Sequence, residues 1–331
     1  MATSSASRAG FRAVWRQPAL VLAEIAWRWS WGLASLAVLA VCARTFLLNI
    51  TVTDAEMVEL RSQAPVLVAD AINRMLEGSG AILARMAAVA VPAMALLWIV
   101  TASLGSAAVL KALLPQAGKP KMRTLLGVHF LRAAAALAAI LGYMGASIVA
   151  SRVTAPAEDT TPQEAATHLG AFILVFLGLV ALVALAWGTV NWYLSLSPVL
   201  VVRDGRDTFG ALADAGALVR RHRREFWSVG FLSGMLRLFF MGVLTVVSIP
   251  PLYLIGEVPG WVVWAIIAAF TLVYFAVADF LYVARLAAYI EIAERDQQEE
   301  STQQSALSIQ PVEAVPPSGP PGEPPGVAPT V

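Results

Sequence analysis

The stretch LGAFILVFLGLVALVALAWGTVNWY, residues 169–193, contains no charged side chain and decides the fold class. About 20 apolar residues in an α-helix are enough to cross the hydrocarbon core of a bilayer. A helix is expected because an isolated strand would leave its backbone N–H and C=O groups unpaired in lipid. The stretch therefore predicts a membrane-spanning helix.

Five further stretches have the same length and apolar character. The chain is therefore predicted to be an all-α, polytopic membrane helix bundle with six transmembrane helices. The composition agrees, because 58% of the 331 residues are hydrophobic and 14% are charged, whereas soluble domains carry about 25% charged residues. The predicted spans are about 31–51, 83–108, 128–150, 169–193, 228–252 and 261–284.

The basic residues between the spans predict the orientation of the bundle. Cytoplasmic connections of membrane proteins are enriched in Lys and Arg. With the N-terminus inside, 16 of the 23 basic residues fall on the inner side, and only Arg61, Arg74 and Arg152 on the outer side. Both termini are therefore expected in the cytoplasm (N-in, C-in). The abundant Ala, Val and Arg are typical of a bacterial chain, which places the multi-pass protein in the inner (cytoplasmic) membrane.

Segments outside the spans are also expected to be helical. An amphipathic lead-in helix is predicted on the inner surface over residues 10–30, and an external amphipathic segment over 54–78, interrupted by Pro65. Pro198 is expected to end the fourth spanning helix, because proline lacks an N–H and clashes with the preceding turn. A cytoplasmic surface helix should follow over 207–224.

Two parts of the chain differ in composition. Residues 1–295 form the six-span membrane domain, whereas residues 296–331 are dense in Pro, Gln, Ser and Glu and contain no aromatic residue. Such a segment cannot bury enough apolar surface to offset its chain entropy. We therefore predict a disordered, proline-rich cytoplasmic tail over 296–331.

A basic cluster ends the predicted surface helix. Cations are favoured at a helix C-terminus by the helix dipole, and at the membrane surface they meet anionic headgroups. The first interpretation is a positive anchor for the fifth span, and the alternative is a specific headgroup or partner site. Nucleic acid is not an expected partner, because the net charge is +1 and no compact basic domain surrounds the cluster. The candidate headgroup contacts are Arg220, Arg221, Arg223 and Arg224.

The same region carries a resemblance. SPVLVVRDGRDTFGALADAGALVRRHRREFWSVGFLSGM, residues 197–235, resembles a pattern of uncharacterised bacterial multi-span membrane proteins. More distantly it is similar to the membrane domain attached to some glycerophosphoryl diester phosphodiesterases. YFAVADFLYVARLAAYIEIAE, residues 274–294, resembles the closing helix of the first group, although Ala215 replaces a frequent Ser. The resemblance implies a membrane module and carries no activity, because no phosphodiesterase catalytic domain is present.

Ionisable residues inside membrane spans are candidates for function. Arg44, Arg85 and Arg132 each lie within about two turns of a span end, where a long side chain can reach the interface. Arg237 is in the fifth span and Asp279 in the sixth, and a short external turn makes these helices antiparallel neighbours. We predict an Arg237–Asp279 pair, interpreted first as a structural salt bridge and alternatively as a substrate or proton site. Gly230 and Gly234 form a GxxxG pattern, which indicates close helix contact.

No catalytic motif is present, and we expect no catalytic, cofactor-binding or metal-binding residues. A hydrolase needs a nucleophile and a base together, yet His129, His168 and His222 are scattered and Cys42 is the only cysteine. The sequence therefore favours a non-enzymatic integral membrane protein in envelope organisation, or a membrane partner or scaffold. Its expected partners are the lipid bilayer with its anionic headgroups, another membrane protein, or a second copy. The alternative is a small-molecule or lipid transporter.

Overall fold

The structure is a computed structural model that describes residues 3–50, 52–62, 65–155, 162–254 and 257–308. The described residues form ten α-helices and one short 3-10 helix, with no β-strand. In chain order these are α1 (Thr3–Arg16), α2 (Pro18–Asn49), α3 (Asp54–Arg61), α4 (Pro65–Gly78), α5 (Gly80–Leu113), α6 (Met122–Val153), α7 (Pro162–Asp204), α8 (Thr208–Arg221), α9 (Arg223–Val247), η1 (Pro250–Leu254) and α10 (Gly260–Ser308).

Six of these helices, α2, α5, α6, α7, α9 and α10, are long and apolar enough to cross a membrane. The predicted all-α fold with six spans is confirmed. The chain is a multi-pass membrane protein.

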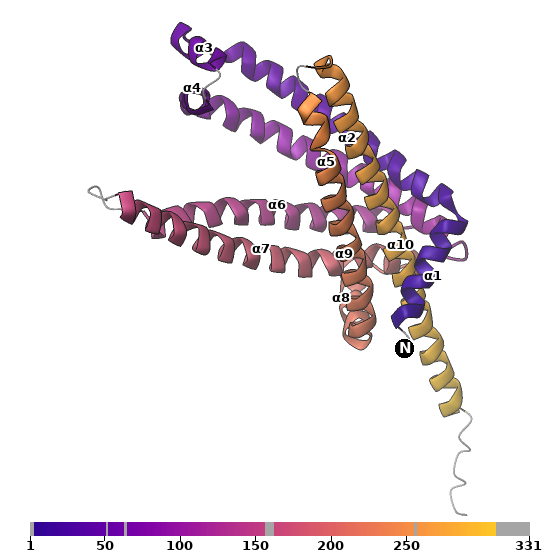
Figure 1. The fold of residues 1–331 in the computed structure, drawn as a ribbon. Helices are drawn as coiled ribbons and strands as arrows, with labels where there is room; N and C mark the ends of the chain where they lie inside the picture. The colour runs from indigo at the N-terminus through magenta and orange to yellow at the C-terminus, as the bar shows by residue number, and fades with distance from the viewer. Residues whose placement is uncertain (1–2, 51, 63–64, 156–161, 255–256, 309–331) are drawn as a thin grey trace, which may run out of the picture.

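The long helices pair in chain order into three helical hairpins (Figure 1). The pairs are α2 with α5, α6 with α7, and α9 with α10, and the hairpins meet at one end and diverge toward the other. The helices α3 and α4 lie at the far end of the first hairpin, whereas α1 and α8 lie where the hairpins meet. The α5–α6 connection and both described ends of the chain are also at this common end. An even number of spans must bring both ends of the chain to the same side of the membrane, and this arrangement agrees with that. Which side faces the cytoplasm stays a prediction.

The main hydrophobic core lies at the common end of the hairpins. It is built by the inner ends of α5, α6, α7 and α10, together with α8 and the first turns of α9. We call this region the packed base. Most of its buried side chains lie beyond the predicted spans, because α5, α6, α7 and α10 are longer than the spans predicted within them. Large members of the core are Leu110, Leu125, Leu196, Leu200, Val219, Phe226, Tyr289 and Ile292.

The remaining parts of the three hairpins, which we call the arms, are scarcely buried within the chain. In the most apolar 18-residue stretch of each span, the buried share of residues runs from 0% in α7 to 22% in α5. Contacts within each hairpin hold the two helices of an arm together, as between α6 and α7. The arms therefore leave most of their apolar surface to the surroundings.

The predicted end of the fourth span at Pro198 is wrong, because α7 continues through this proline to Asp204. A proline inside a helix costs about 3 kcal/mol. The four residues that follow it, Val199 to Val202, are all buried in the packed base. Burying four aliphatic side chains outweighs that cost. The surface helix then begins as predicted, because the Asp207 side chain accepts a hydrogen bond from the Gly210 N–H at 3.2 Å and caps α8.

The predicted lead-in helix over 10–30 is two helices rather than one. It divides at Gln17, and α2 begins with Pro18 in its first turn. Helix α1 does not lie alone on a surface but packs against α10, where Val14 is buried beside Val283 and Ala287.

The predicted tail begins later than expected, because α10 continues to Ser308. Its extension past the membrane domain contains Gln and Glu, which are good helix formers, and it meets α8 through Asp296 and Glu300. The rest of the predicted tail, 309–331, lies outside the described residues. The external segment, by contrast, is helical as predicted, with α3 and α4 on either side of the interruption near Pro65.

Close helix contacts occur at glycines other than the predicted GxxxG. A Cβ on Gly234 would meet nothing within 4 Å, and one on Gly230 would make an ordinary contact with Tyr289. A Cβ on Gly105 of α5, however, would lie 2.3 Å from the Trp27 ring of α2, and one on Gly10 of α1 would lie 2.3 Å from a backbone oxygen of α10. These two glycines let the helices approach closely near the base.

Candidate functional site

A buried ionic cluster joins α2 to α10 near the packed base. Glu24 and Arg28 lie one turn apart on α2, and the Arg28 Nε donates to Glu24 Oε1 at 2.5 Å. The Arg28 Nη1 lies 3.2 Å from Asp279 Oδ1 on α10. One guanidinium therefore bridges two carboxylates on different helices.

The surroundings of this cluster exclude water from the carboxylates. Glu24 is 1% exposed and Asp279 is 4% exposed. The Trp27 Nε1 donates a second hydrogen bond to Glu24 at 2.9 Å, and the Arg28 guanidinium lies 4.2 Å from the centre of the Tyr282 ring. Buried charges are tolerated when they are paired and hydrogen-bonded in this way. The arrangement fits a clamp between two helices.

The predicted Arg237–Asp279 pair is not the ion pair that the structure contains. The Arg237 Nε instead donates to the Tyr274 hydroxyl at 3.3 Å, within the α9–α10 hairpin. Asp279 is paired with Arg28, because α2 packs against α10 as well. The sequence indicated that α9 and α10 are neighbours but contained no signal for this second neighbour of α10.

The four arginines of the basic cluster do not share one environment. Arg221 makes ion pairs with Asp296, at 3.4 Å, and with Glu300 in the extension of α10. Arg220 lines an apolar groove between α6, α7 and α8. Arg223 and Arg224 are exposed, and no described carboxylate lies within ion-pair distance of either. Only these last two match a simple headgroup-facing anchor.

Two of the histidines, His129 and His222, contact side chains of other helices. His129 is buried in α6 with its ring edge-on to Trp98, at 5.6 Å between ring centres, and neither ring nitrogen has a partner among the described residues. His222, between α8 and α9, lies with its Nε2 2.8 Å from Asp296 Oδ1. Within the described ranges, no group of three His, Cys, Asp or Glu side chains is arranged to hold a metal ion.

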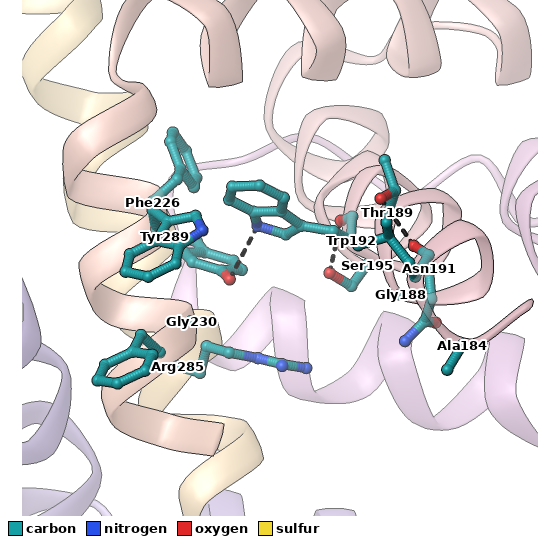
Figure 2. A pocket seen from close by; sticks show the side chains of 13 residues that line it. Ala184, Gly188, Thr189, Asn191, Trp192, Ser195, Phe226, Gly230, Arg285 and Tyr289 are labelled. Atoms are coloured by element: carbon teal, nitrogen blue, oxygen red, sulfur yellow. Dashed lines mark hydrogen bonds between the residues drawn. The ribbon is translucent and has the colours of Figure 1, made fainter. Parts of the chain in front are cut away.

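A partly open cavity of about 400 Å³ lies between α7, α9 and α10 (Figure 2). Its walls are largely apolar and aromatic, with Phe226, Trp227 and Phe231 on α9. Arg285 extends from α10 across the cavity toward α7, whose Asn191 and Trp192 lie opposite. From the sequence, Arg285 is only one of the 16 basic residues predicted on the inner side. The available signal was the position of Asn191 and Arg285 at the inner ends of two predicted spans.

No protein-family model, no curated protein and no solved structure matches this chain. The resemblance of residues 195–295 to bacterial multi-span membrane proteins therefore stays a prediction. The fold and the chemistry of the described residues are the basis for function.

Proposed function

We propose that this protein is a non-enzymatic membrane scaffold in a bacterial inner membrane, with its packed base in the cytoplasm. The observation that carries the proposal is the contrast between a well-packed base and three diverging arms that bury little of their own surface. The packed base holds the three hairpins together at one end. Beyond it, the arms expose long apolar surfaces. Such flanks suit contact with helices of other membrane proteins.

Large apolar side chains cover the exposed flanks of the arms. Leu174 on α7 is 76% exposed, and Leu185 on α7 and Phe239 on α9 are also exposed. Lipid tails are as apolar as Leu, so helices in a membrane associate through shape and polar contacts rather than through the hydrophobic effect. Diverging arms of fixed direction offer such a shape to a guest helix. The partner would be another membrane protein or a second copy of this chain.

Photo-crosslinking in the native membrane tests the scaffold. A photoreactive amino acid replaces Leu174 in an arm, and a matched variant carries it at Phe209, an exposed residue of α8 outside the arms. We expect a protein adduct of defined mass from position 174 and not from position 209. Adducts with lipid alone at position 174 would overturn the scaffold role.

A lipid or small-molecule transporter is the second candidate, and two partly open cavities favour it, one between α7, α9 and α10 and one between α6, α7 and α8. Transporters commonly bind substrate at broken helices near the midplane. Two prolines interrupt spanning helices, Pro92 in α5 and Pro198 in α7, and the latter lies in the packed base rather than at the midplane. Movement of fluorescent lipid between leaflets, measured in reconstituted vesicles, tests this candidate. Exchange faster than in protein-free vesicles would favour the transporter over the scaffold.

A further inference from the structure

We propose that the cavity between α7, α9 and α10 binds the phosphate of an anionic phospholipid, with Arg285 as its principal cation. The inference is independent of the scaffold role, because a bound lipid can fill this site whether or not a partner protein binds the arms. Charge, hydrogen-bond donors and position in the membrane each support it.

The first support is an unbalanced charge. No described carboxylate lies within ion-pair distance of Arg285, whose guanidinium is flanked by the rings of Tyr282, at 5.5 Å, and Tyr289, at 6.0 Å. The residues that line the cavity include no Asp or Glu. Of the acids on the neighbouring turns, Glu225 and Glu291 both face Arg295. The cavity therefore has a positive charge and an apolar wall, and it lacks an anion.

The second support is a set of donors that are left over after the internal hydrogen bonds are made. Asn191 Oδ1 accepts from Arg132 Nε at 3.0 Å, so the amide NH₂ of Asn191 remains available to donate. The Tyr289 oxygen accepts from Trp192 Nε1 at 3.1 Å, which leaves the Tyr289 O–H as a donor (Figure 2). Phosphate oxygens accept such bonds, and an arginine binds them with matched geometry.

The third support is the depth of the cavity. It lies where the predicted spans of α7, α9 and α10 end, at residues 193, 228 and 284, which is the level of the lipid headgroups. Trp192 and Trp227, on two of its walls, have the preference of tryptophan for this level. A phospholipid with its phosphate here can extend its acyl chains along the exposed apolar flanks of the arms. Free phosphate would fill the polar end and leave the aromatic wall without a partner.

Lipid retention by the full chain tests the site. The protein is equilibrated in neutral detergent with equal phosphatidylglycerol and phosphatidylcholine, and bound lipid is counted by native mass spectrometry. Two variants remove the site: Arg285→Gln removes the charge, and Gly188→Leu fills the cavity, since a Cβ at Gly188 meets nothing within 4 Å. We expect Arg285→Gln to weaken phosphatidylglycerol binding about tenfold, the effect of one charge-assisted hydrogen bond. Gly188→Leu should also weaken it, because the added side chain occupies the space of the lipid.

Two matched controls keep the test specific. Gly178→Leu makes the same substitution on α7 at an open position that does not line the cavity. Lys119→Gln removes one exposed charge from the same end of the molecule, in the connection between α5 and α6, away from both the cavity and the basic cluster. Both should retain phosphatidylglycerol as the unchanged protein does. The proposal is overturned if Lys119→Gln weakens binding as much as Arg285→Gln, if Gly188→Leu leaves binding unchanged, or if excess inorganic phosphate displaces the lipid.

Discussion

The packed base and the arms share five long helices, α5, α6, α7, α9 and α10, yet they differ in how these helices associate. In the base, side chains of α5, α6, α7, α8, α9 and α10 interlock in one core. In the arms, the same helices diverge as hairpins and bury between 0% and 22% of their most apolar stretches. The change occurs near the predicted inner boundary of the spans.

The difference follows from the solvent on either side of that boundary. In water, apolar side chains gain about 25 cal/mol for each Å² removed from solvent, so extensions of the helices past the membrane collapse on one another. In lipid this driving force is absent, and helices stay together only where small residues or polar groups hold them. The packed base thus corresponds to the part predicted to meet water, and the arms to the part predicted to meet lipid.

The largest expected effect is at the Glu24–Arg28–Asp279 cluster, where the two regions meet. Arg28→Met leaves two buried carboxylates without their cation, and loss of one partner of a buried pair costs about 3 kcal/mol or more. Thermal unfolding in neutral detergent should show a large drop in stability. Arg44→Met on the same helix is the control, since Arg44 is exposed in the arm and has no described ion-pair partner; its effect should be small.

A double-mutant cycle sharpens this result. Arg28→Met and Asp279→Leu should be non-additive, because the two charges are 3.2 Å apart. Arg237→Met and Asp279→Leu should be nearly additive, because Arg237 bonds to Tyr274 instead. If Arg237→Met and Asp279→Leu are instead non-additive, and Arg28→Met and Asp279→Leu additive, Asp279 pairs with Arg237 as the sequence predicted.

A smaller effect is expected from glycine substitutions that compare the two regions. Gly105→Ala places a methyl group against the Trp27 ring and should destabilise the protein by about 1–3 kcal/mol, as overpacking does. Gly145→Ala in α6 meets open space, and removal of a mid-helix glycine should stabilise by about 0.5–1 kcal/mol. If Gly105→Ala raises the unfolding temperature, as Gly145→Ala is expected to do, the contact at Gly105 is not tight.

The extension of α10 past the base should be sensitive to one exposed charge. The hydrogen bond to Glu300 and the charge of Asp296 raise the pKa of Arg221, which is the sign of favourable contact between this cation and the two carboxylates. Arg221→Gln should make the amides of residues 297–305 exchange faster with solvent, and added salt should reduce the difference by screening. Arg223→Gln, which removes a charge without an ion pair, should leave exchange unchanged. Equal exchange in both variants would show that the extension does not depend on α8.

The smallest effect is expected at the far end, where α3 is held by local hydrogen bonds. The Thr53 N–H and hydroxyl donate to the Glu56 carboxylate and lower its pKa. Because the folded pKa lies below the unfolded value, this stabilisation is present above the ordinary pKa and is lost as the pH falls through the lowered pKa. In an NMR titration, Thr53→Val should raise the pKa of Glu56 toward its ordinary value. A titration curve unchanged by this substitution would show that the capping box does not form in solution.

The sequence by itself determined the six spans, the all-α fold class and the presence of further helices between the spans. These features depend on local rules: an apolar run of sufficient length must be helical in lipid, and Asp207 can cap the helix that follows it. It did not determine the continuation of α7 through Pro198, because the burial that offsets the proline comes from α8 and other distant segments.

The partners of the charged side chains were decided only by the tertiary structure. Asp279 has Arg237 on one neighbouring helix and Arg28 on another, and hydropathy and spacing along α10 cannot choose between them. The cavity around Arg285 likewise combines side chains from α7, α9 and α10 that are up to about 100 positions apart in sequence. Spans follow from the solvent that each segment meets, whereas ion pairs and cavities depend on which helices the packed base brings together.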